Sequence, residues 1–249
     1  PRGNPEVEET LKRKLLYRSQ AEVVKDVFIR GRRCLAVAGT HGKTTTTSIA
    51  SWVMDQGGLN PSFLIGGVAQ NFDSSFRVSN SDYMIIEADE YDTAYFDKGP
   101  KFMHYLPELA IVNNIEFDHA DIYRDLDAVK LAFRRFMNLV PGNGCLIAGW
   151  DSPNVRAVVA EMGSRLFTRV ETFGFQSDAK WQVQNPNFSA QLSRFDVYCE
   201  NKKWGEFETP LLGEFNLANC LAVIIAGTVW GLSQEEIRQA LVTFKNVKR

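Results

Sequence analysis

Cysteine is scarce in this 249-residue chain, and its four cysteines stand far apart, at Cys34, Cys145, Cys199 and Cys220. No two of them form a C-x-x-C pair, so neither a cysteine zinc site nor a disulfide framework is indicated. Scattered cysteines of this kind are typical of proteins kept in a reducing compartment. We therefore expect a cytoplasmic protein.

Long apolar runs and an excess of charge of one sign are also missing. No stretch reaches the roughly eighteen apolar residues of a membrane span, and residues 1–5 lack the hydrophobic segment of a signal peptide. The formal net charge of -2 gives no reason to expect a nucleic-acid partner. We expect a soluble protein without membrane insertion, whose two ends look like cuts within a longer chain.

Residues 34–49 have the pattern of a phosphate-binding loop. An apolar strand over residues 34–38 leads into a loop between Gly39 and Gly42, and a helix rich in hydroxyl groups follows. The two glycines let successive backbone N–H groups point into one concavity at the positive end of the helix. Lys43 can then reach terminal phosphates, and the hydroxyl of Thr44 can bind a magnesium ion that the phosphates share.

The stretch departs from the strict G-x-x-x-x-G-K-[ST] pattern, because Val37 stands where that pattern has its first glycine. The match is to the geometry of such loops. The alternative is an ordinary strand-to-helix turn with a solvated lysine, as any α/β domain contains.

Polar side chains follow two further apolar runs, residues 83–86 and 109–112. The first run is followed by Glu87, Asp89, Glu90 and Asp92, and the second by Asn113, Asn114, Glu116, Asp118, His119 and Asp121. Parallel sheets bind ligands at the carboxyl ends of their strands. The sequence therefore predicts that both acidic strand ends and the phosphate loop form one site.

The remaining pattern predicts an α/β fold with a mostly parallel sheet of the phosphate-loop type, flanked by helices. Helical spacing of apolar residues indicates helices over 21–29, 128–139, 214–229 and 233–244, the last opened by a capping box of Ser233 and Glu236. Beyond Arg169 the segments 170–175, 179–183, 194–199 and 204–208 are short and partly alternating. These segments predict a small antiparallel sheet appended to the parallel one.

Four motifs, in this order, resemble the central ATPase domain of the Mur ligases, the amide-forming enzymes of bacterial cell-wall synthesis. The motifs are Gly39-Thr40-His41-Gly42-Lys43-Thr44-Thr45, Glu87-Ala88-Asp89-Glu90, Asn114-Ile115-Glu116-Phe117-Asp118-His119 and Gly213-Glu214-Phe215-Asn216-Leu217-Ala218-Asn219. The resemblance implies that residues 31–249 are the central ATP-binding domain. Residues 1–30 would be the tail of a UDP-binding domain with a linker helix, and the amino-substrate domain would follow residue 249.

The resemblance also implies roles for individual residues. Lys43, Glu87 and His119 would carry the catalysis, with ATP and Mg²⁺ as cofactors. The magnesium ligands would be Thr44, Glu87 and His119, and the nucleotide would be held by Gly39, Thr40, His41, Gly42, Lys43, Thr44, Thr45, Asn216 and Asn219.

Purely structural interpretations of these residues are the alternatives. Glu87 could be a surface carboxylate or an ion-pair partner, and His119 an ordinary loop histidine. Asn216 and Asn219 could merely cap a helix. Phe215 stands where these ligases commonly carry histidine, and its ring can still stack on a base. Some relatives have a carbamylated lysine on the helix that follows, where this chain offers Lys130 or, in another register, Phe133.

Within the family, residues 87–105 resemble the branch of murein recycling that joins a ready-made murein tripeptide to UDP-N-acetylmuramate through an acyl phosphate. The alternatives are a ligase that adds L-alanine to UDP-N-acetylmuramate, a folylpolyglutamate-type ligase, and a non-catalytic ATP-binding module or nucleotide switch. A switch has no need of a second metal ligand set beside the terminal phosphate, which favours the ligase.

Overall fold

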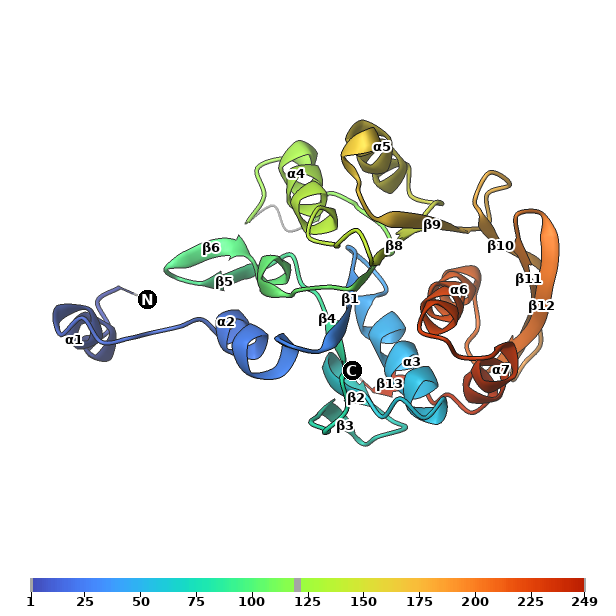
Figure 1. Ribbon diagram of the computed structural model, residues 1–249, viewed down its shortest axis with the longest axis horizontal. Helices are drawn as coiled ribbons and strands as arrows, with labels where there is room; N and C mark the ends of the chain where they lie inside the picture. The colour runs from blue at the N-terminus through green and yellow to red at the C-terminus, as the bar shows by residue number, and fades with distance from the viewer. Residues whose placement is uncertain (1, 119–121, 249) are drawn as a thin grey trace.

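The computed structural model describes residues 2–118 and 122–248 of the chain. Eleven strands among these residues form the main sheet (Figure 1). Its path, from one edge to the other, runs through β12 (Lys202–Thr209), β11 (Ser193–Cys199), β10 (Trp181–Phe188), β9 (Arg169–Gly174), β8 (Cys145–Gly149), β7 (Leu109–Val112), β1 (Arg33–Ala38), β4 (Tyr83–Glu87), β2 (Ser62–Ala69) and β13 (Val247–Lys248). Strand β3 (Ser74–Arg77) pairs with β2 beside this path.

Most pairings are parallel, as the sequence predicted. The strands from β2 through β4, β1, β7, β8 and β9 to β10 are parallel, whereas β11 and β12 are antiparallel extensions of the same sheet. The predicted α/β fold with appended antiparallel strands is confirmed. The prediction was wrong for residues 170–175, because β9 pairs in parallel with both of its neighbours.

Helices cover both faces of the sheet. They are α2 (Gln20–Val24), α3 (Lys43–Gln56), α4 (Leu126–Met137), α5 (Pro153–Met162), α6 (Glu214–Val229) and α7 (Gln234–Val242), whereas α1 (Pro5–Lys12) lies apart. One π-helical turn over residues 25–29 continues α2, so the predicted helix over 21–29 is present in two parts. Helix α5 had no counterpart in the sequence analysis.

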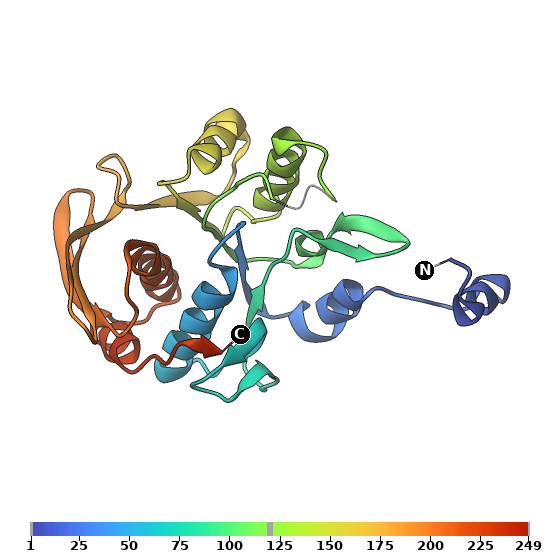
Figure 2. The ribbon, with the colours of Figure 1, turned by 180° about the vertical axis from the view of Figure 1, so that it is seen from behind.

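The central strand β1 divides its side chains between two hydrophobic cores. Leu35 and Val37 pack with α3, α6 and α7, whereas Cys34, Ala36 and Ala38 pack with α2, α4 and α5. A strand buried on both faces carries apolar residues at every position, which is what the run in β1 shows. Figure 2 shows the same two layers from behind, with α6 between α3 and the antiparallel strands.

Two elements stand apart from this body. Helix α1 buries no residue and lies at one end of the molecule (Figure 1). Strands β5 (Asp92–Ala94) and β6 (Asp97–Pro100) form a separate two-stranded hairpin that follows directly on β4.

The strand order brings the predicted site together. β1 lies between β4 and β7, with Val37 in register with Glu87 and Ala38 in register with Val112. The loop after β1 is therefore flanked on one side by Glu87 and on the other by Asn113.

Candidate functional site

The loop after β1 has the backbone of an anion site. Gly39 and Gly42 both have positive φ, 138° and 84°. A Cβ atom on Gly42 would lie 2.9 Å from the side-chain atoms Nδ2 of Asn113 and Oδ1 of Asn219. The chain therefore needs glycine there to begin α3 at Lys43, and the N-terminus of α3 opens at the carboxyl edge of the sheet.

Lys43 is buried at the base of this loop. Its ammonium Nζ lies 2.8 Å from the carbonyl oxygen of Gly39 and 2.8 Å from Oε2 of Glu90, and 3.5 Å from the carbonyl oxygen of Thr40. The Glu90 side chain is also buried. A buried charge of this kind needs an ionic partner, and Glu90 supplies it.

Thr44 and Glu87 meet beside the loop. The hydroxyl of Thr44 donates to Oε1 of Glu87 at 2.8 Å, and the backbone N–H of Gly66 donates to Oε2 at 2.7 Å. Burial raises the pKa of Glu87, and these two hydrogen bonds lower it in part. A cation next to this carboxylate would favour its charged form.

The donor chemistry of this pair fits Mg²⁺. Magnesium prefers oxygen ligands and is usually held by one or two protein oxygens together with substrate phosphates. The hydroxyl of Thr44 and the carboxylate of Glu87 provide such oxygens next to an anion-binding loop. Over residues 2–118 and 122–248, no group of three or more His, Cys, Asp or Glu side chains could hold a metal by itself.

Two asparagines from the end of β7 brace the loop. The Nδ2 group of Asn113 donates to the hydroxyl of Thr46 at 3.0 Å and to the backbone oxygen of His41 at 3.4 Å. Oδ1 of Asn114 accepts from the backbone N–H of His41 at 2.7 Å. Oδ1 of Asn113 is buried and has no hydrogen-bond partner among the described residues, which is unusual for a buried acceptor.

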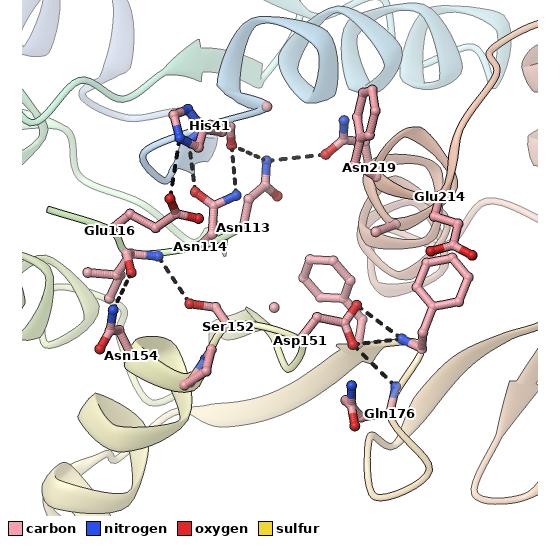
Figure 3. Close-up of a pocket in the computed structure, with 18 residues that line it drawn as sticks. His41, Asn113, Asn114, Glu116, Asp151, Ser152, Asn154, Gln176, Glu214 and Asn219 are labelled. Atoms are coloured by element: carbon pink, nitrogen blue, oxygen red, sulfur yellow. Dashed lines mark hydrogen bonds and ion pairs between the residues drawn. The ribbon is translucent and has the colours of Figure 1, made fainter. Parts of the chain in front are cut away.

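A cavity of about 800 Å³ opens next to the loop (Figure 3). One wall comes from the loop and the end of β7, and the other from β8, β9 and the start of α6. It is lined by His41, Gly42, Asn113, Asn114, Ile115, Glu116, Gly149, Asp151, Ser152, Pro153, Asn154, Phe173, Phe175, Gln176, Glu214, Phe215, Ala218 and Asn219. Its volume suits a ligand of nucleotide size.

The far wall of the cavity combines aromatic and polar groups. Phe215 is 72% exposed, so its ring is available for stacking. The Asp151 carboxylate accepts from the backbone N–H groups of Phe175, at 2.9 and 3.1 Å, and of Gln176, at 3.2 Å, and so fixes the turn after β9. Burial raises the pKa of Asp151, against these hydrogen bonds.

The sequence matches the Mur ligase middle domain family over residues 37–227. That match covers more than half of the chain and includes the phosphate loop, the ends of β4 and β7 and the start of α6.

The chain belongs to the Mur ligase family.

Curated Mur ligases resemble the whole chain. It is 41% identical over 248 residues to the UDP-N-acetylmuramate–L-alanyl-gamma-D-glutamyl-meso-2,6-diaminoheptandioate ligase of Escherichia coli, covering 100% of this chain and 53% of that protein. It is 36% identical over 249 residues to the UDP-N-acetylmuramate–L-alanine ligase of Salinibacter ruber, covering 100% of this chain and 50% of that protein. The chain thus spans about half the length of the curated Mur ligases it matches.

A solved structure of a Mur ligase is equally similar. The crystal structure of the UDP-N-acetylmuramate:L-alanyl-gamma-D-glutamyl-meso-diaminopimelate ligase from Neisseria meningitides superposes with a TM-score of 0.91 at 40% identity, covering 100% of this chain and 77% of that one. No helix within the described residues of this Mur ligase chain is long and apolar enough to cross a membrane.

The structure brings most of the predicted site residues of this Mur ligase chain to one sheet edge. The backbone N–H of Thr40 donates to the carbonyl oxygen of Asn114, and Nε2 of His41 lies 3.6 Å from the Glu116 carboxylate. Thr45 is half-buried in the first turn of α3. His119 and Asp121 lie outside the described residues.

The two predicted asparagines of α6 differ in position. Asn219 lines the cavity, and its Oδ1 lies 3.5 Å from Nδ2 of Asn113. The Nδ2 group of Asn216 donates to the backbone oxygen of Leu212 at 2.8 Å, which braces the start of α6. The capping alternative was wrong, because the N-cap residue of α6 is Gly213 and neither asparagine makes a capping hydrogen bond. Asn216 is bonded to the loop before the helix, whereas Asn219 lies in the cavity wall.

Lys130 and Phe133 are the two alternatives for the position at which some relatives carry a carbamylated lysine. Both lie on α4. Lys130 is half-buried, whereas Phe133 is fully buried and packs on Phe102 in the core.

The sequence analysis missed part of the far wall of the cavity. Asp151, Phe175 and Gln176 were not predicted, although Asp151 follows β8 at the same sheet edge as Glu87 and Asn113. The rule of polar residues at strand ends could have found Asp151. It would have found Gln176 only if β9 had been recognised as a parallel strand, because an antiparallel strand would end at the other edge.

Proposed function

We propose that the complete protein is an ATP-dependent ligase that forms an amide bond between UDP-N-acetylmuramate and murein tripeptide. The observation that carries this proposal is the meeting of the Thr44 hydroxyl and the Glu87 carboxylate, 2.8 Å apart, beside the phosphate loop. A non-catalytic nucleotide-binding module has no need of a second magnesium ion beside the terminal phosphate, for which the half-buried Glu87 offers a carboxylate. A ligase that brings a carboxylate substrate onto a triphosphate needs positive charge there.

The loop residues Gly39 to Thr45 would hold the phosphates, with Lys43 at the terminal phosphate. Thr44, Glu87 and His119 would hold magnesium, which supplies positive charge to the phosphates and to the attacking carboxylate. These are also the residues we propose as catalytic, together with Lys43. The roles fit the fold, because the loop lies between the strands that carry Glu87 and Asn113.

The adenine and ribose would occupy the cavity beside the loop. Phe215 offers an exposed ring for stacking, and Asn219 lies in the wall. Asn216 would act on the base only indirectly, since its side chain is bonded to the backbone of Leu212. The buried Oδ1 of Asn113 would gain a partner when a donor group of the nucleotide or an ordered water enters.

We also propose a division into domains. Residues 31–249 would be the central ATP-binding domain, and residues 1–30 would end a UDP-binding domain and link it to this one. Two facts support the division: α1 buries no residue, and the curated relatives are about twice as long as the chain. We expect the reaction in the bacterial cytoplasm, where ATP is available.

The sequence identities to the two kinds of relative support the tripeptide as the amino substrate. The relative whose name contains the tripeptide is 41% identical, whereas the L-alanine ligase is 36% identical. The difference is small, and both relatives match the whole chain. The choice of amino substrate therefore needs a direct assay.

The assay measures ADP release by the complete protein with UDP-N-acetylmuramate and either murein tripeptide or L-alanine. We expect release with the tripeptide at a rate at least tenfold above that with alanine. Preference for alanine would support the L-alanine ligase. A third assay with a folate and glutamate tests the folylpolyglutamate-type ligase, which ADP release with this pair would support. No ADP release with any of the three pairs would support the non-catalytic module.

Two substitutions complete the assay. Lys43→Ala should abolish ADP release, because the charge at the terminal phosphate is lost. Cys145→Ala is the matched control: Cys145 is fully enclosed in β8 and burial raises the pKa of its thiol to about 11, so it is a protonated core side chain. It should lower stability and leave the rate within about twofold. Equal losses in both variants would show that the site is misplaced.

A further inference from the structure

The ammonium of Lys43 is held by two short contacts. Nζ lies 2.8 Å from the carbonyl oxygen of Gly39 and 2.8 Å from Oε2 of Glu90, whereas the carbonyl oxygen of Thr40 is 3.5 Å away. A lysine ammonium has three N–H donors. Two of them are therefore committed to short contacts, and the third makes only a long one.

Glu90 does not belong to the phosphate loop. It follows β4, and its carboxylate reaches Lys43 from the neighbouring strand end. Its side chain is 3% exposed, so the pair with Lys43 is shielded from water. The attraction between the two charges is less screened there than at the surface, and removing either partner would leave the other charge buried without compensation.

The backbone around Glu90 is fixed by its surroundings. The hydroxyl of the buried Tyr123 donates to the carbonyl oxygen of Glu90 at 2.7 Å. On either side, the carbonyl oxygens of Asp89 and Tyr91 accept from the backbone N–H groups of Phe102, at 3.1 Å, and Lys101, at 2.9 Å. The turn that follows the β5–β6 hairpin therefore sets where the Glu90 carboxylate lies.

We propose that Glu90 is a positioning residue for Lys43. Its carboxylate and the carbonyl oxygen of Gly39 fix the ammonium so that the third N–H is directed to the terminal phosphate, where it replaces the long contact to Thr40. The ammonium then needs no reorientation when phosphoryl transfer begins, which is how a preorganised charge lowers a barrier. This inference rests on the proposed ligase function.

The test uses the complete protein with UDP-N-acetylmuramate, murein tripeptide and magnesium–ATP. Glu90→Gln keeps the shape of the side chain and removes its charge. We expect kcat to fall at least tenfold. The Kd for magnesium–ATP should change less than threefold, because the substitution has two opposing effects. Lys43 is held less firmly, which weakens binding, but a negative charge near the phosphates is removed, which strengthens it. KM for the other two substrates should stay within twofold.

Glu108→Gln is the matched control. Glu108 makes an ion pair of the same kind, with Arg33 at 2.6 Å, but it directly precedes β7 and so lies at the opposite end of the strands from the site. We expect its kcat within twofold of the wild type. A tenfold loss in this control as well would overturn the inference, because the effect would then follow from the loss of any ion-paired glutamate.

A second background separates positioning from mere stability. The Glu90→Gln change is made a second time in a Lys43→Arg protein, in which a guanidinium group replaces the ammonium and keeps the positive charge. In that protein, Glu90→Gln should change the residual kcat less than threefold. An equal tenfold effect in both backgrounds would show that Glu90 does not act through Lys43, and would overturn the inference.

Glu90→Asp keeps the inference testable if Glu90→Gln fails to fold. It retains the charge and withdraws the carboxylate by one methylene group, so kcat should fall at least threefold with unchanged KM for the acceptor substrates. An unchanged kcat overturns the inference. If the wild-type protein releases no ADP, the proposed function fails and this inference with it; if the wild type is active and the Glu90 variants match it, only this inference fails.

Discussion

Asn113 joins three segments that are far apart in the sequence. From the end of β7, its Nδ2 group reaches the hydroxyl of Thr46 on α3, the backbone oxygen of His41 in the loop and Oδ1 of Asn219 on α6. Its backbone also leaves no room for a side chain at the last residue of β8, since a Cβ atom on Gly149 would lie 1.9 Å from the Asn113 carbonyl oxygen. One amide thus ties the phosphate loop to the cavity that we propose for the nucleotide.

Asn113→Asp should weaken magnesium–ATP binding. The substitution replaces an N–H₂ donor by a carboxylate oxygen, so the contacts to the backbone oxygen of His41 and to Oδ1 of Asn219 are lost and a negative charge is added near the phosphates. A loss of about 1–3 kcal/mol of binding free energy, which is about 5- to 150-fold in Kd, is expected. Isothermal titration calorimetry measures it directly.

Asn138→Asp is the control for this prediction. Asn138 is exposed at the C-terminal end of α4, where the same chemical change lies outside the cavity. Its Kd should equal that of the wild type. If both variants bind magnesium–ATP like the wild type, the cavity beside Asn113 is not the nucleotide site.

At the scale of elements, α6 is apolar on all sides because protein surrounds it. Its residues from Cys220 to Ala226 are all fully buried, and the helix contacts α3, α7, β8, β9 and β10. A helix that is apolar all round needs such an enclosed position. Burial of α6 fixes its first two turns, and with them the positions of Phe215 and Asn219 in the cavity wall.

Helix α7 offers a test of local stability. Ser233 caps its N-terminus, because its hydroxyl oxygen accepts from the backbone N–H of Glu236 at 3.3 Å. In return, the Glu236 carboxylate accepts from the backbone N–H of Ser233 at 2.8 Å and from its hydroxyl at 2.7 Å. Ser233→Ala should lower the free energy of unfolding by about 1 kcal/mol. Ser177→Ala, at an exposed position outside any helix, should leave it unchanged. Chemical denaturation measures both.

The same cap predicts a pH dependence. The hydrogen bonds from Ser233 lower the pKa of Glu236 below its ordinary value of 4.5. A lowered pKa in the folded state means that this stabilisation is fully present above 4.5 and is lost as the pH falls through the lowered value. Glu236→Gln should therefore have a lower Tm than the wild type at neutral pH, and the gap should narrow in acid. A gap that is independent of pH contradicts the assignment.

At the scale of the whole molecule, two hydrophobic cores hold one sheet edge rigid. The cores lie on opposite faces of the central strands, and the loops that build the candidate site all leave from the carboxyl ends of those strands. The site residues lie in short loops, and the packed strands from which these loops leave hold them in position. Such an edge is the common place for ligands in α/β folds.

The 249-residue chain by itself should bind magnesium–ATP and form no amide. On the proposed division, the UDP-sugar and the amine bind to other domains of the complete protein, so the isolated chain would hold neither substrate near the phosphate. ADP release with both substrates should be at least a hundredfold slower than for the complete protein. Amide formation at a comparable rate would contradict the proposed division into domains.

The features that were predicted correctly depend on neighbouring residues. The phosphate loop, the strand over 109–112 and the helix over 214–229 each show a continuous local pattern, and each is present. Helix α5 also had local signals that were not recognised, since Ser152 caps it, Pro153 opens it, and Val155, Val158 and Met162 recur at helical spacing. The direction of β9 could not be seen locally, because a short alternating segment suits either kind of pairing.

The sequence by itself determined the kind of chemistry: a glycine-bounded loop before Lys43 and Thr44, and acidic groups at strand ends, all encoded within a few neighbouring residues. Only the tertiary structure decided which groups meet. The position of β1 between β4 and β7 brings Glu87 to Thr44 and Asn113 to the loop, and the turn after the hairpin directs Glu90 to Lys43. These contacts depend on strand order and on burial from both faces, which no local stretch of residues specifies.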